Sequence, residues 1–402
     1  MKKILFVDDE QNILDGLRRM LYKMREEWEM TFVTSGKEAL ELMETGPFDA
    51  VISDMRMSEM NGAQLLRKVK ELYPDTVRFI LSGHSDRELV MQSLGCTHQY
   101  LAKPCDPEVL VGTIKNSLSL RHILSNKNIR GIISNMPSLP TLPKTYNKLL
   151  SALENENTSI EDLASIITED VGMTAQVLHL VNSAFFGLTS HVDTALRAIS
   201  LLGIETLKSL VLTSGIFRQF EISDLEELSL ESIYNHSILI GKYAKNVAVK
   251  MQMDKKLVEE ALLGGLMHDI GKAILLQYLR DKYKNTLQLA KQENVPLYRA
   301  EYEVFGVSHA EIGAYLLSLW GETDSIVEAV AFHHQPNATN TPGINALFAV
   351  HTANAIYHKQ FYDDENEWRL MVLDEVYVKN IIQPDTFEEV INTCSELESQ
   401  GA

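Results

Sequence analysis

Acidic, hydroxyl and amino side chains follow the short apolar runs in the first 120 residues of the chain. Asp8 and Asp9 follow the first run, Asp54 the third, Ser82 the fourth and Lys103 the fifth. If these runs are strands of an open parallel sheet, the five side chains gather at its carboxyl edge, where such sheets bind ligands. Three converging carboxylates repel one another unless a hard cation neutralises them, and Mg²⁺ binds through oxygen ligands. The pattern therefore predicts a magnesium site formed by Asp8, Asp9 and Asp54.

Asp54 in such a site is equipped to attack a phosphoryl group. A carboxylate beside Mg²⁺ and a lysine suits this reaction, because the two cations neutralise charge on the transferring oxygens. The product would be an aspartyl phosphate. Taken singly, each aspartate is more often a turn or helix-cap residue, and Lys103 is more often solvated. The ordered recurrence of all five positions favours the phosphoacceptor hypothesis.

Two different hydrophobic patterns divide the chain. Five strand-like apolar runs alternate with amphipathic stretches in the first part, at residues 4–7, 30–33, 50–52, 77–81 and 100–101. This alternation predicts a flavodoxin-like, doubly wound α/β domain with a five-stranded parallel sheet. Apolar positions from about residue 145 to 362 have helical spacing, which predicts an all-α domain. Prolines near the junction disfavour helix and sheet alike, so the predicted divisions are 1–122, a linker at 123–143, the helical domain at 144–380 and an acidic tail at 381–402.

The first domain carries four short motifs in order, which are VDDE at 7–10, ISDMRM at 52–57, LSGH at 81–84 and YLAKP at 100–104. With these motifs, residues 1 to about 122 resemble the receiver domain of bacterial response regulators. One departure is Ser58, where the family commonly has proline. The resemblance implies that a sensor histidine kinase phosphorylates Asp54, and that the Lys103–Pro104 peptide bond is cis.

The same resemblance gives the other polar residues their roles. Asp8 and Asp9, with the backbone carbonyl of Arg56, would hold Mg²⁺, and Lys103 would contact the phosphoryl group. Ser82 and Tyr100 would form the switch that responds to phosphorylation, although an aromatic residue in a strand is usually a core residue. The face built from the fourth and fifth strands would then contact either the helical domain or a second protomer in a homodimer.

Histidine and aspartate side chains recur through the helical part at spacings that suit a metal site. His268 and Asp269 are adjacent in GLMHDIGK at 265–272 and offer a nitrogen and an oxygen to one ion. A histidine 32 residues upstream suits an antiparallel neighbouring helix, and HHQP at 333–336 would extend the site to a second ion. Iron, manganese or another divalent metal held there could activate water for hydrolysis of a phosphate ester. The candidate ligands are His236, His268, Asp269, His309, His333 and His334.

The helical part resembles the HD superfamily of metal-dependent phosphohydrolases, and two branches of it compete. The HDOD branch, a signalling domain regarded as lacking hydrolase activity, is resembled by LPTLP at 139–143, TEDVGMTAQVLHLVNSAFFG at 168–187 and ALRAISLLGIETLKSLVL at 195–212. That resemblance covers roughly residues 134–330. The histidine pattern instead resembles the HD-GYP branch, which cleaves cyclic di-GMP.

The sequence departs from the HD-GYP pattern at three places. Ser232 stands where that branch has a glutamate, the GYP tripeptide is absent after the double histidine, and Asn354 replaces the closing aspartate. An amide is a weak ligand for a hard dication, so the set has lost anionic charge. His268 and Asp269 could also form a buried polar pair that fixes helix packing without metal. Ordinary core or surface positions are expected for His179, His191 and His358.

Composition and charge limit the classes of function. With 37 basic and 55 acidic residues the net charge is −18, which disfavours binding to nucleic acid. No apolar stretch approaches the about 20 residues that span a bilayer. The start MKKILFVDDE has too short an apolar run for a secretory signal, so we expect the cytoplasm. The three cysteines match neither a disulfide framework nor a zinc motif.

These observations leave two hypotheses for the whole chain. The first is a two-component response regulator whose receiver controls an HDOD output that binds an unidentified signalling protein without catalysis. The alternative is a phosphorylation-gated, metal-dependent cyclic di-GMP phosphodiesterase of HD-GYP type. The missing GYP tripeptide and the departures at Ser232 and Asn354 favour binding, whereas the retained HD and HH pairs favour catalysis.

Overall fold

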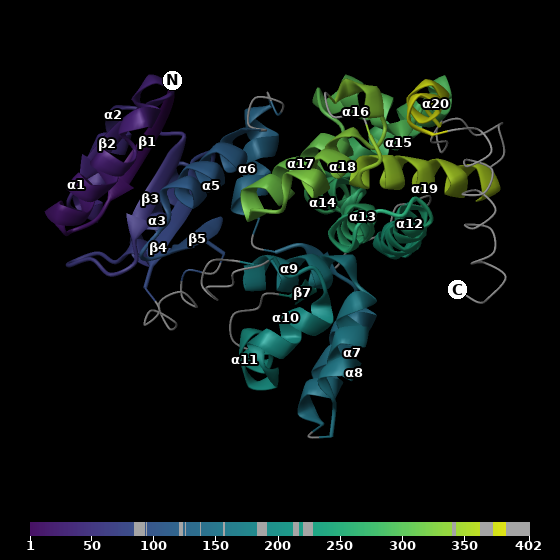
Figure 1. The fold of residues 1–402 in the computed structure, drawn as a ribbon, viewed down its shortest axis with the longest axis horizontal. Coiled ribbons are helices and arrows are strands. Elements are labelled where there is room, and N and C mark those ends of the chain that lie inside the picture. Colours follow the sequence, from purple (N-terminus) through teal and green to yellow (C-terminus); the bar gives the residue numbers. More distant parts are fainter. Residues whose placement is uncertain are drawn as a thin grey trace.

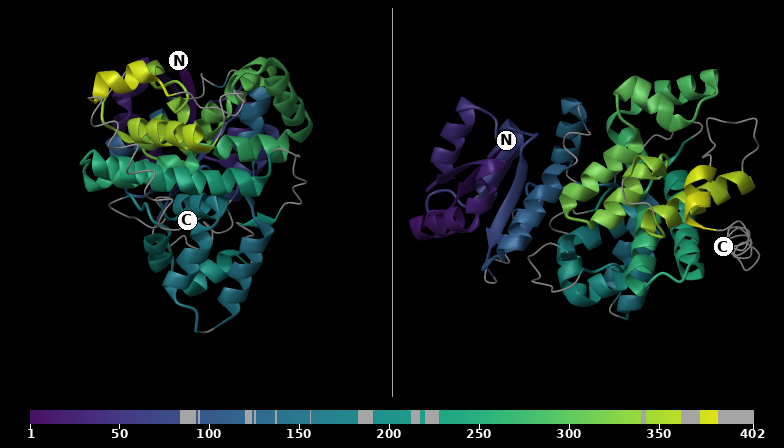
Figure 2. Two further views of the ribbon diagram at one scale, coloured as in Figure 1. Left: turned by 90° about the vertical axis from the view of Figure 1, so that its right-hand side faces the viewer. Right: turned by 45° about the horizontal axis from the view of Figure 1, so that its top comes forward.

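The computed structural model describes most of the chain (Figure 1). Its described residues are 1–83, 93, 95–119, 124, 126–136, 138–155, 157–182, 191–211, 217–219, 228–339, 343–361 and 373–382. The N-terminal α/β domain is followed by a larger helical domain, and α5 (Pro107–Ser119) and α6 (Lys127–Asn135) lie between the sheet and the later helices (Figure 2). Most of the predicted acidic tail, including Cys394, lies outside the described residues.

The N-terminal domain is built on one parallel sheet with the strand order β2-β1-β3-β4-β5. The strands are β1 (Lys2–Val7), β2 (Trp28–Val33), β3 (Ala50–Asp54), β4 (Val77–Ser82) and β5 (Gln99–Ala102). The predicted five-stranded α/β fold is confirmed. Asp54 and Ser82 are themselves the last residues of their strands, so both strands extend beyond the apolar runs that predicted them. The strand order reverses between β1 and β3, and doubly wound sheets bind ligands at such a switch point.

Both faces of the sheet are covered, as expected for parallel strands. Ile4 and Phe6 of β1 belong to one large apolar core, whereas Leu5 and Val7 pack into a second core on the opposite face. Besides α5, the structure describes in this domain the helices α1 (Gln11–Met20), the 3-10 helix η1 (Tyr22–Glu26), α2 (Gly36–Thr45) and α3 (Gly62–Leu72). The side chains at the carboxyl edge are therefore held by a buried scaffold.

The described part of the second domain is mostly helical, which confirms the predicted fold class. Its main helices are α7 (Pro143–Glu154), α8 (Ile160–Thr168), α9 (Val171–Asn182), α10 (Ala195–Leu202), α11 (Ile204–Ser209), α12 (Leu230–Lys250), α13 (Lys255–Met267), α14 (Ile270–Tyr278), α15 (Arg280–Glu293), α16 (Leu297–Phe305), α17 (His309–Trp320), α18 (Asp324–Phe332), α19 (Ala346–Phe361) and α20 (Glu375–Ile381). Short additions are η5 (Pro336–Ala338) and the parallel pair of β6 (Pro140–Thr141) and β7 (Arg218–Gln219). None of the helices in the described part of the chain combines the length and apolar character needed to cross a membrane.

The segment around residues 125–143, predicted to lack helix and sheet, contains helix α6, so this prediction is wrong in part. The Asn126 side chain caps α6 by accepting backbone N–H groups of its first turn, and Ile129 and Ile133 are buried one turn apart. The prolines all follow α6. Pro140 lies in β6, and Pro143 is at the start of α7, a position that suits proline. Prolines restrict the backbone only close to themselves, so they did not prevent a helix upstream.

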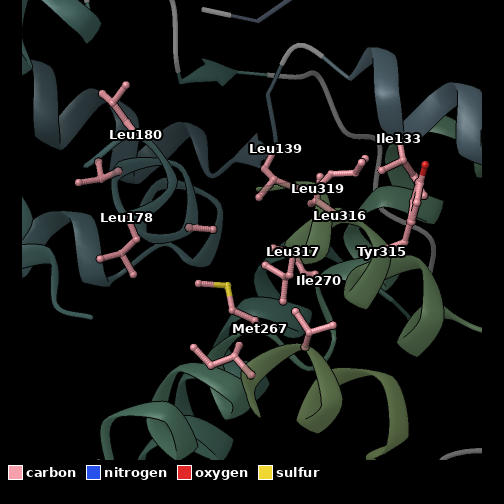
Figure 3. Packing of buried hydrophobic residues seen from close by; sticks show 14 of the residues in the cluster. Ile133, Leu139, Leu178, Leu180, Met267, Ile270, Tyr315, Leu316, Leu317 and Leu319 are labelled. Atoms are coloured by element: carbon pink, nitrogen blue, oxygen red, sulfur yellow. The ribbon is translucent and has the colours of Figure 1, made fainter. Parts of the chain in front are cut away.

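Buried polar and apolar contacts join the two domains. The Arg78 side chain of β4 is buried and donates to the backbone carbonyl of Ser134 in α6. Burial lowers the pKa of Arg78 to about 10, so its guanidinium is still charged at neutral pH. Figure 3 shows Tyr315 of α17 beside Ile133 of α6, within the large apolar core that both domains share. The receiver-like sheet and the helices therefore form one packed unit.

Candidate functional site

The acidic site at the carboxyl edge of the sheet is assembled around Lys103. The Nζ atom of Lys103 lies 2.7 Å from Oδ2 of Asp8 and also donates to Oδ1 of Asp54. Asp8 directly follows β1, Asp54 ends β3 and Lys103 directly follows β5, so the parallel strands bring three distant segments together. The backbone N–H of Arg56 donates to Oδ2 of Asp54 at 2.6 Å. The Asp54 carboxylate is thereby held between an ammonium group and a backbone N–H.

Burial and charge act in opposite directions on this site. Burial raises the pKa of Asp54 and the Asp8 charge adds to the rise, whereas the hydrogen bond from Lys103 lowers it. Burial alone would lower the pKa of Lys103, but its hydrogen bonds to both carboxylates produce a net rise. Two carboxylates against one ammonium leave a negative charge that a divalent cation would neutralise. The donor set therefore fits Mg²⁺.

Asp9 is placed differently from Asp8 and Asp54. Its side chain is exposed, and its Oδ2 accepts the backbone N–H of Ser58 at 2.8 Å. Among the residues that the structure describes, these three carboxylates do not form a group with all ligand atoms within 4.8 Å of one another. The structure thus brings Asp8 and Asp54 together and holds Asp9 at the rim of the site.

The two predicted switch residues lie on neighbouring strands. Ser82 is the last residue of β4, and its carbonyl accepts the backbone N–H of Lys103 at 2.8 Å. Tyr100 of β5 is buried, and its hydroxyl oxygen lies 2.8 Å from the hydroxyl oxygen of Ser93. Tyr100 also belongs to the second apolar core of the sheet. The Lys103–Pro104 bond is cis, as expected.

A second candidate site lies inside the helical domain, where α12, α13, α14, α17 and α18 meet around Asp269. The Asp269 Oδ2 atom lies 3.3 Å from Nε2 of His268 and 3.7 Å from Nε2 of His236. Its Oδ1 atom lies 3.2 Å from Nε2 of His309 and 3.9 Å from Nε2 of His333. All six predicted ligands are brought together, and we call them the histidine centre: His236, His268, Asp269, His309, His333 and His334.

The ligand atoms of the histidine centre form two groups of three. His236, His268 and Asp269 form one group, and the second consists of His309, His333 and His334, with the atoms of each group within 4.8 Å of one another. Nε2 of His334 lies 3.0 Å from Nε2 of His309. Because the two oxygens of Asp269 face different groups, Asp269 lies between the two predicted ion positions.

Backbone carbonyls fix the tautomers of two histidines in the centre. Nδ1 of His268 donates to the carbonyl of Gly265 at 2.7 Å, and Nδ1 of His333 donates to the carbonyl of Val330 at 2.8 Å. Their Nε2 atoms therefore carry lone pairs, and these buried atoms meet no hydrogen-bond partner among the described residues. The buried Nε2 atom of His236 is in the same position. Buried lone pairs are costly unless a donor or a cation meets them, so the centre fits a divalent metal.

The charges in the centre also suit metal binding. Burial alone would raise the pKa of Asp269, but His268 and Lys272 hold it well below its usual range. Nζ of Lys272 lies 2.7 Å from Oδ2 of Asp269. Burial lowers the pKa of His236, His333 and His334, which keeps their imidazoles neutral at pH 7. Neutral imidazole and ionised carboxylate are the forms that bind a metal ion.

Glu301 of α16 holds His309 from the side of its ring that faces away from Asp269. This residue was not predicted from the sequence. Its buried carboxylate accepts from Nδ1 of His309 at 2.6 Å and from the backbone N–H of His309 at 2.7 Å. Its other oxygen accepts the Tyr283 hydroxyl at 3.0 Å. A carboxylate bonded to the far nitrogen of a ligand histidine fixes its tautomer and raises its basicity. A glutamate between buried positions of α16 is the signal that could have revealed it.

Gly271 accounts for the glycine in the motif GLMHDIGK. A Cβ atom on Gly271 would lie 2.0 Å from the carbonyl oxygen of His309, because α14 and α17 approach closely at this point. A side chain there would push the first residue of α17 away from Asp269. Gly271 therefore sets the separation between two helices that carry ligands.

The positions that depart from the HD-GYP pattern have different surroundings. Ser232 is exposed and forms a capping box with Ser229 at the start of α12, so it lies outside the centre. Asn354 of α19 is buried, and its Oδ1 atom has no hydrogen-bond partner in the part of the chain that the structure describes. The ring of His358, also on α19, lies 5.4 Å from the ring of His236, measured between centroids. Thus α19 places His358, for which an ordinary position was expected, beside the histidine centre.

Comparisons with known proteins match both parts of the chain. A model of the response regulator receiver domain matches residues 4–115, and a model of the HDOD domain matches residues 139–336. An uncharacterized protein of Treponema pallidum is 25% identical over 210 residues, which are 52% of this chain and 40% of that protein. The hydrogenase transcriptional regulatory protein HoxA of Bradyrhizobium diazoefficiens is 36% identical over 131 residues, 32% of this chain and 26% of HoxA. The chain thus spans less than half the length of these two relatives.

Among solved structures, the MmoQ response regulator of Methylococcus capsulatus is 22% identical, with a TM-score of 0.46, and the match covers 61% of this chain and 98% of that one. The family of the chain is shown by the two family models. They match separate segments, in the order that the motifs predicted. The chain is therefore a response regulator in which a receiver domain precedes an HDOD domain.

Proposed function

We propose that a sensor histidine kinase in the cytoplasm phosphorylates Asp54, and that the phosphorylated receiver controls the HDOD domain, which signals by binding another protein. The observation that carries this proposal is the contact of Lys103 with both Asp8 and Asp54. Asp8, Asp9 and Asp54 would hold Mg²⁺. When bound, this ion supplies positive charge that neutralises the phosphoryl oxygens.

The residues around Asp54 prepare its carboxylate for phosphoryl transfer. Lys103 donates to Oδ1 and the N–H of Arg56 donates to Oδ2, which together fix the plane of the carboxylate. As an Asp54 oxygen bonds to phosphorus and the donor's leaving group departs, the Lys103 ammonium is in place to stabilise charge on the transferred oxygens. Ser82 ends the strand next to β3 and can offer its hydroxyl to the new phosphoryl group. Movement of Ser82 would then reach β5, which carries Tyr100.

Phosphoryl uptake tests this function. Incubation with acetyl phosphate and Mg²⁺ should add one phosphoryl group per chain, observed by intact-mass analysis. A chain that stays unmodified in a buffer that phosphorylates another receiver would contradict the proposal.

An output by binding agrees with two of the three departures from the HD-GYP pattern. Ser232 caps helix α12 at the surface. At position 354 the neutral amide of Asn354 stands where the HD-GYP pattern has a carboxylate. Loss of two anionic ligands weakens a two-ion site, because each carboxylate offsets part of the charge of the ions. We propose that the downstream signalling protein binds the HDOD domain and that the remaining histidine centre holds metal for structure or regulation.

A second candidate function is metal-dependent hydrolysis of a phosphodiester such as cyclic di-GMP. It is favoured by the three buried Nε2 atoms near Asp269 that meet no hydrogen-bond partner among the described residues. The residues of the histidine centre would hold the metal. When bound, the metal supplies a Lewis acid and lowers the pKa of a coordinated water. Lys272 and Asp269 would set the charge next to the reacting phosphate.

Turnover distinguishes output by binding from output by catalysis. We expect the protein loaded with Mn²⁺ or Fe²⁺ under anaerobic conditions to release no linear dinucleotide from cyclic di-GMP at a useful rate, because two anionic ligands are missing. Product analysis by chromatography measures this. Turnover that disappears in Asp269→Asn but persists in Asp254→Asn, a change at the exposed cap of α13, would instead establish the phosphodiesterase.

A further inference from the structure

Helix α17 runs from the histidine centre to the receiver domain. Its first residue is His309, a member of the histidine centre, and its last turn lies against β5 and α5 of the receiver. Its 12 residues at about 1.5 Å per residue make a rod of roughly 17 Å. A helix with satisfied backbone hydrogen bonds moves as a unit, so a shift at one end reaches the other.

The receiver end of α17 is capped by a side chain from the other domain. Nε2 of Gln99 in β5 lies 3.0 Å from the carbonyl oxygen of Leu319 and 3.4 Å from that of Ser318. The last carbonyls of a helix have no partner within the helix. The Gln99 amide gives the Leu319 carbonyl a donor, while the Ser318 carbonyl also accepts the backbone N–H of Gly321 at 3.2 Å. Gln99 is buried, and its Nε2 also donates to the hydroxyl of Ser117 in α5 at 2.7 Å.

Two further contacts fix the axial position of α17 at this end. The hydroxyl of Ser318 donates to the carbonyl of Asn116 in α5 at 2.7 Å. Gly321 ends the helix with a φ of +79°, and a Cβ on it would lie 2.9 Å from Oε1 of Gln99. The Gln99 side chain is thus enclosed on both sides, and its amide position determines where the last turn of α17 lies.

At the other end, α17 is held as closely. The backbone N–H and the Nδ1 atom of His309 both donate to Glu301. Gly271 packs against the backbone carbonyl of His309. An axial shift of α17 therefore changes the distance between Nε2 of His309 and Oδ1 of Asp269, which is 3.2 Å here. Glu301 and Gly271 leave His309 little freedom to absorb such a shift.

A second connection runs in parallel through α6. The C-terminal part of α6 accepts the Arg78 guanidinium of β4 at the carbonyl of Ser134. At its N-terminus, the Asn126 amide donates to the carbonyl of Phe305, the last residue of α16, at 3.2 Å. Helix α16 carries Glu301, so β4 and β5 are each connected to the corner of the histidine centre formed by His309 and Glu301. Figure 3 shows Tyr315, Leu316 and Leu319 of α17 in the apolar core that also contains Ile133 of α6.

Gln99 directly precedes the predicted switch residue Tyr100. Successive side chains of a strand point to opposite faces, so Tyr100 packs into the second core while Gln99 faces α17. A displacement of β5 at Tyr100 thus moves Gln99 as well. The strand is short, from Gln99 to Ala102, and it pairs with β4, which ends at Ser82.

We propose that Gln99 is a positioning residue of the histidine centre: through α17 it makes the metal affinity of His309 and its neighbours depend on the phosphorylation state of Asp54. This inference rests on the proposed function, since it needs both a working phosphoacceptor and a metal-binding centre. The coupling is reciprocal, because a metal that favours one position of α17 must change the affinity of the receiver for a phosphoryl analogue by the same factor.

The test is a Co²⁺ titration of the full chain with and without beryllofluoride, a phosphoryl analogue. Visible absorption of Co²⁺ bound to histidine nitrogen reports the centre, and excess Mg²⁺ fills the receiver site. Beryllofluoride should change the Co²⁺ dissociation constant by about tenfold, within the usual range of allosteric coupling. In Gln99→Met, which keeps the length of the side chain and removes its amide, the change should fall below about twofold at unchanged beryllofluoride binding.

The matched control is Gln11→Met, an exposed position on α1 whose amide donates to Asp15, one turn along the same helix. This variant should keep the full coupling. Coupling retained in Gln99→Met, or Co²⁺ affinity unaffected by bound beryllofluoride in the parent, would overturn the inference and leave the proposed function standing. Failure of the parent to bind beryllofluoride would contradict the receiver function itself, and failure to bind Co²⁺ would contradict the metal centre, so the three failures are distinguishable.

Discussion

Asp54→Asn should abolish phosphorylation of the chain by acetyl phosphate. Asp54 ends the central strand β3, and its carboxylate bonds both to Lys103 and to the backbone of Arg56. An asparagine keeps the size of the side chain but lacks the anionic oxygen that attacks phosphorus. Intact-mass analysis after incubation with Mg²⁺ should therefore show one phosphoryl group on the parent chain and none on the variant.

The control for this change is Asp15→Asn, an exposed aspartate on α1 that pairs with Arg18. It removes the same negative charge from the same domain without touching the acidic site, so phosphorylation should match that of the parent. Equal uptake by Asp54→Asn and by the parent would show that the phosphoryl group resides elsewhere and that the assignment of Asp54 is incorrect.

Asp269→Asn should lower the affinity of the histidine centre for Co²⁺ by more than about 100-fold. Loss of an outer-shell partner alone typically costs 10–100-fold in metal affinity, and Asp269 is a predicted ligand whose oxygens face both halves of the centre. The amide would also leave the charge of Lys272 without its carboxylate partner. A titration followed by visible absorption measures the loss.

A matched variant separates this effect from general damage. Asp254→Asn lies at the start of α13, the helix that leads to His268, and asparagine caps a helix as well as aspartate does. Its Co²⁺ affinity should equal that of the parent. If Asp269→Asn binds Co²⁺ as tightly as Asp254→Asn, the cluster is a buried polar network that fixes helix packing rather than a metal centre.

The receiver fold was predictable because each of its rules is local. An apolar run followed by a polar residue marks the end of a strand, and parallel strands place such ends on one edge, where the structure has Asp8, Asp54 and Lys103. The orientation of Asp9 toward the backbone of Ser58 was not predictable, since it depends on how the loop after β3 folds. The spacing of polar residues indicates which side chains share an edge, but not their rotamers.

In the helical domain, motifs identified the histidines but not the residues that support them. Gln99 bonds to carbonyls 219 and 220 residues further along the chain, and no local pattern records such a contact. Glu301 lies between buried positions of an amphipathic helix, which marks it as unusual, but its bond to His309 follows only from the packing of α16 against α17. Helix α6 was not predicted, for a different reason. The prolines that follow it were expected to exclude a helix in the residues before them as well.

Phosphorylation of Asp54 should change the helical domain, and hydrogen exchange of the full chain tests this most directly. Backbone amides of α17 and α6 should exchange at different rates with and without beryllofluoride and Mg²⁺, because both helices bond to the strands that respond to the phosphoryl group. The same comparison in Asp54→Asn should show no difference. A response in the parent that is confined to residues 1–83 and 95–119, with α6 and α17 unchanged, would contradict control of the HDOD domain by its receiver.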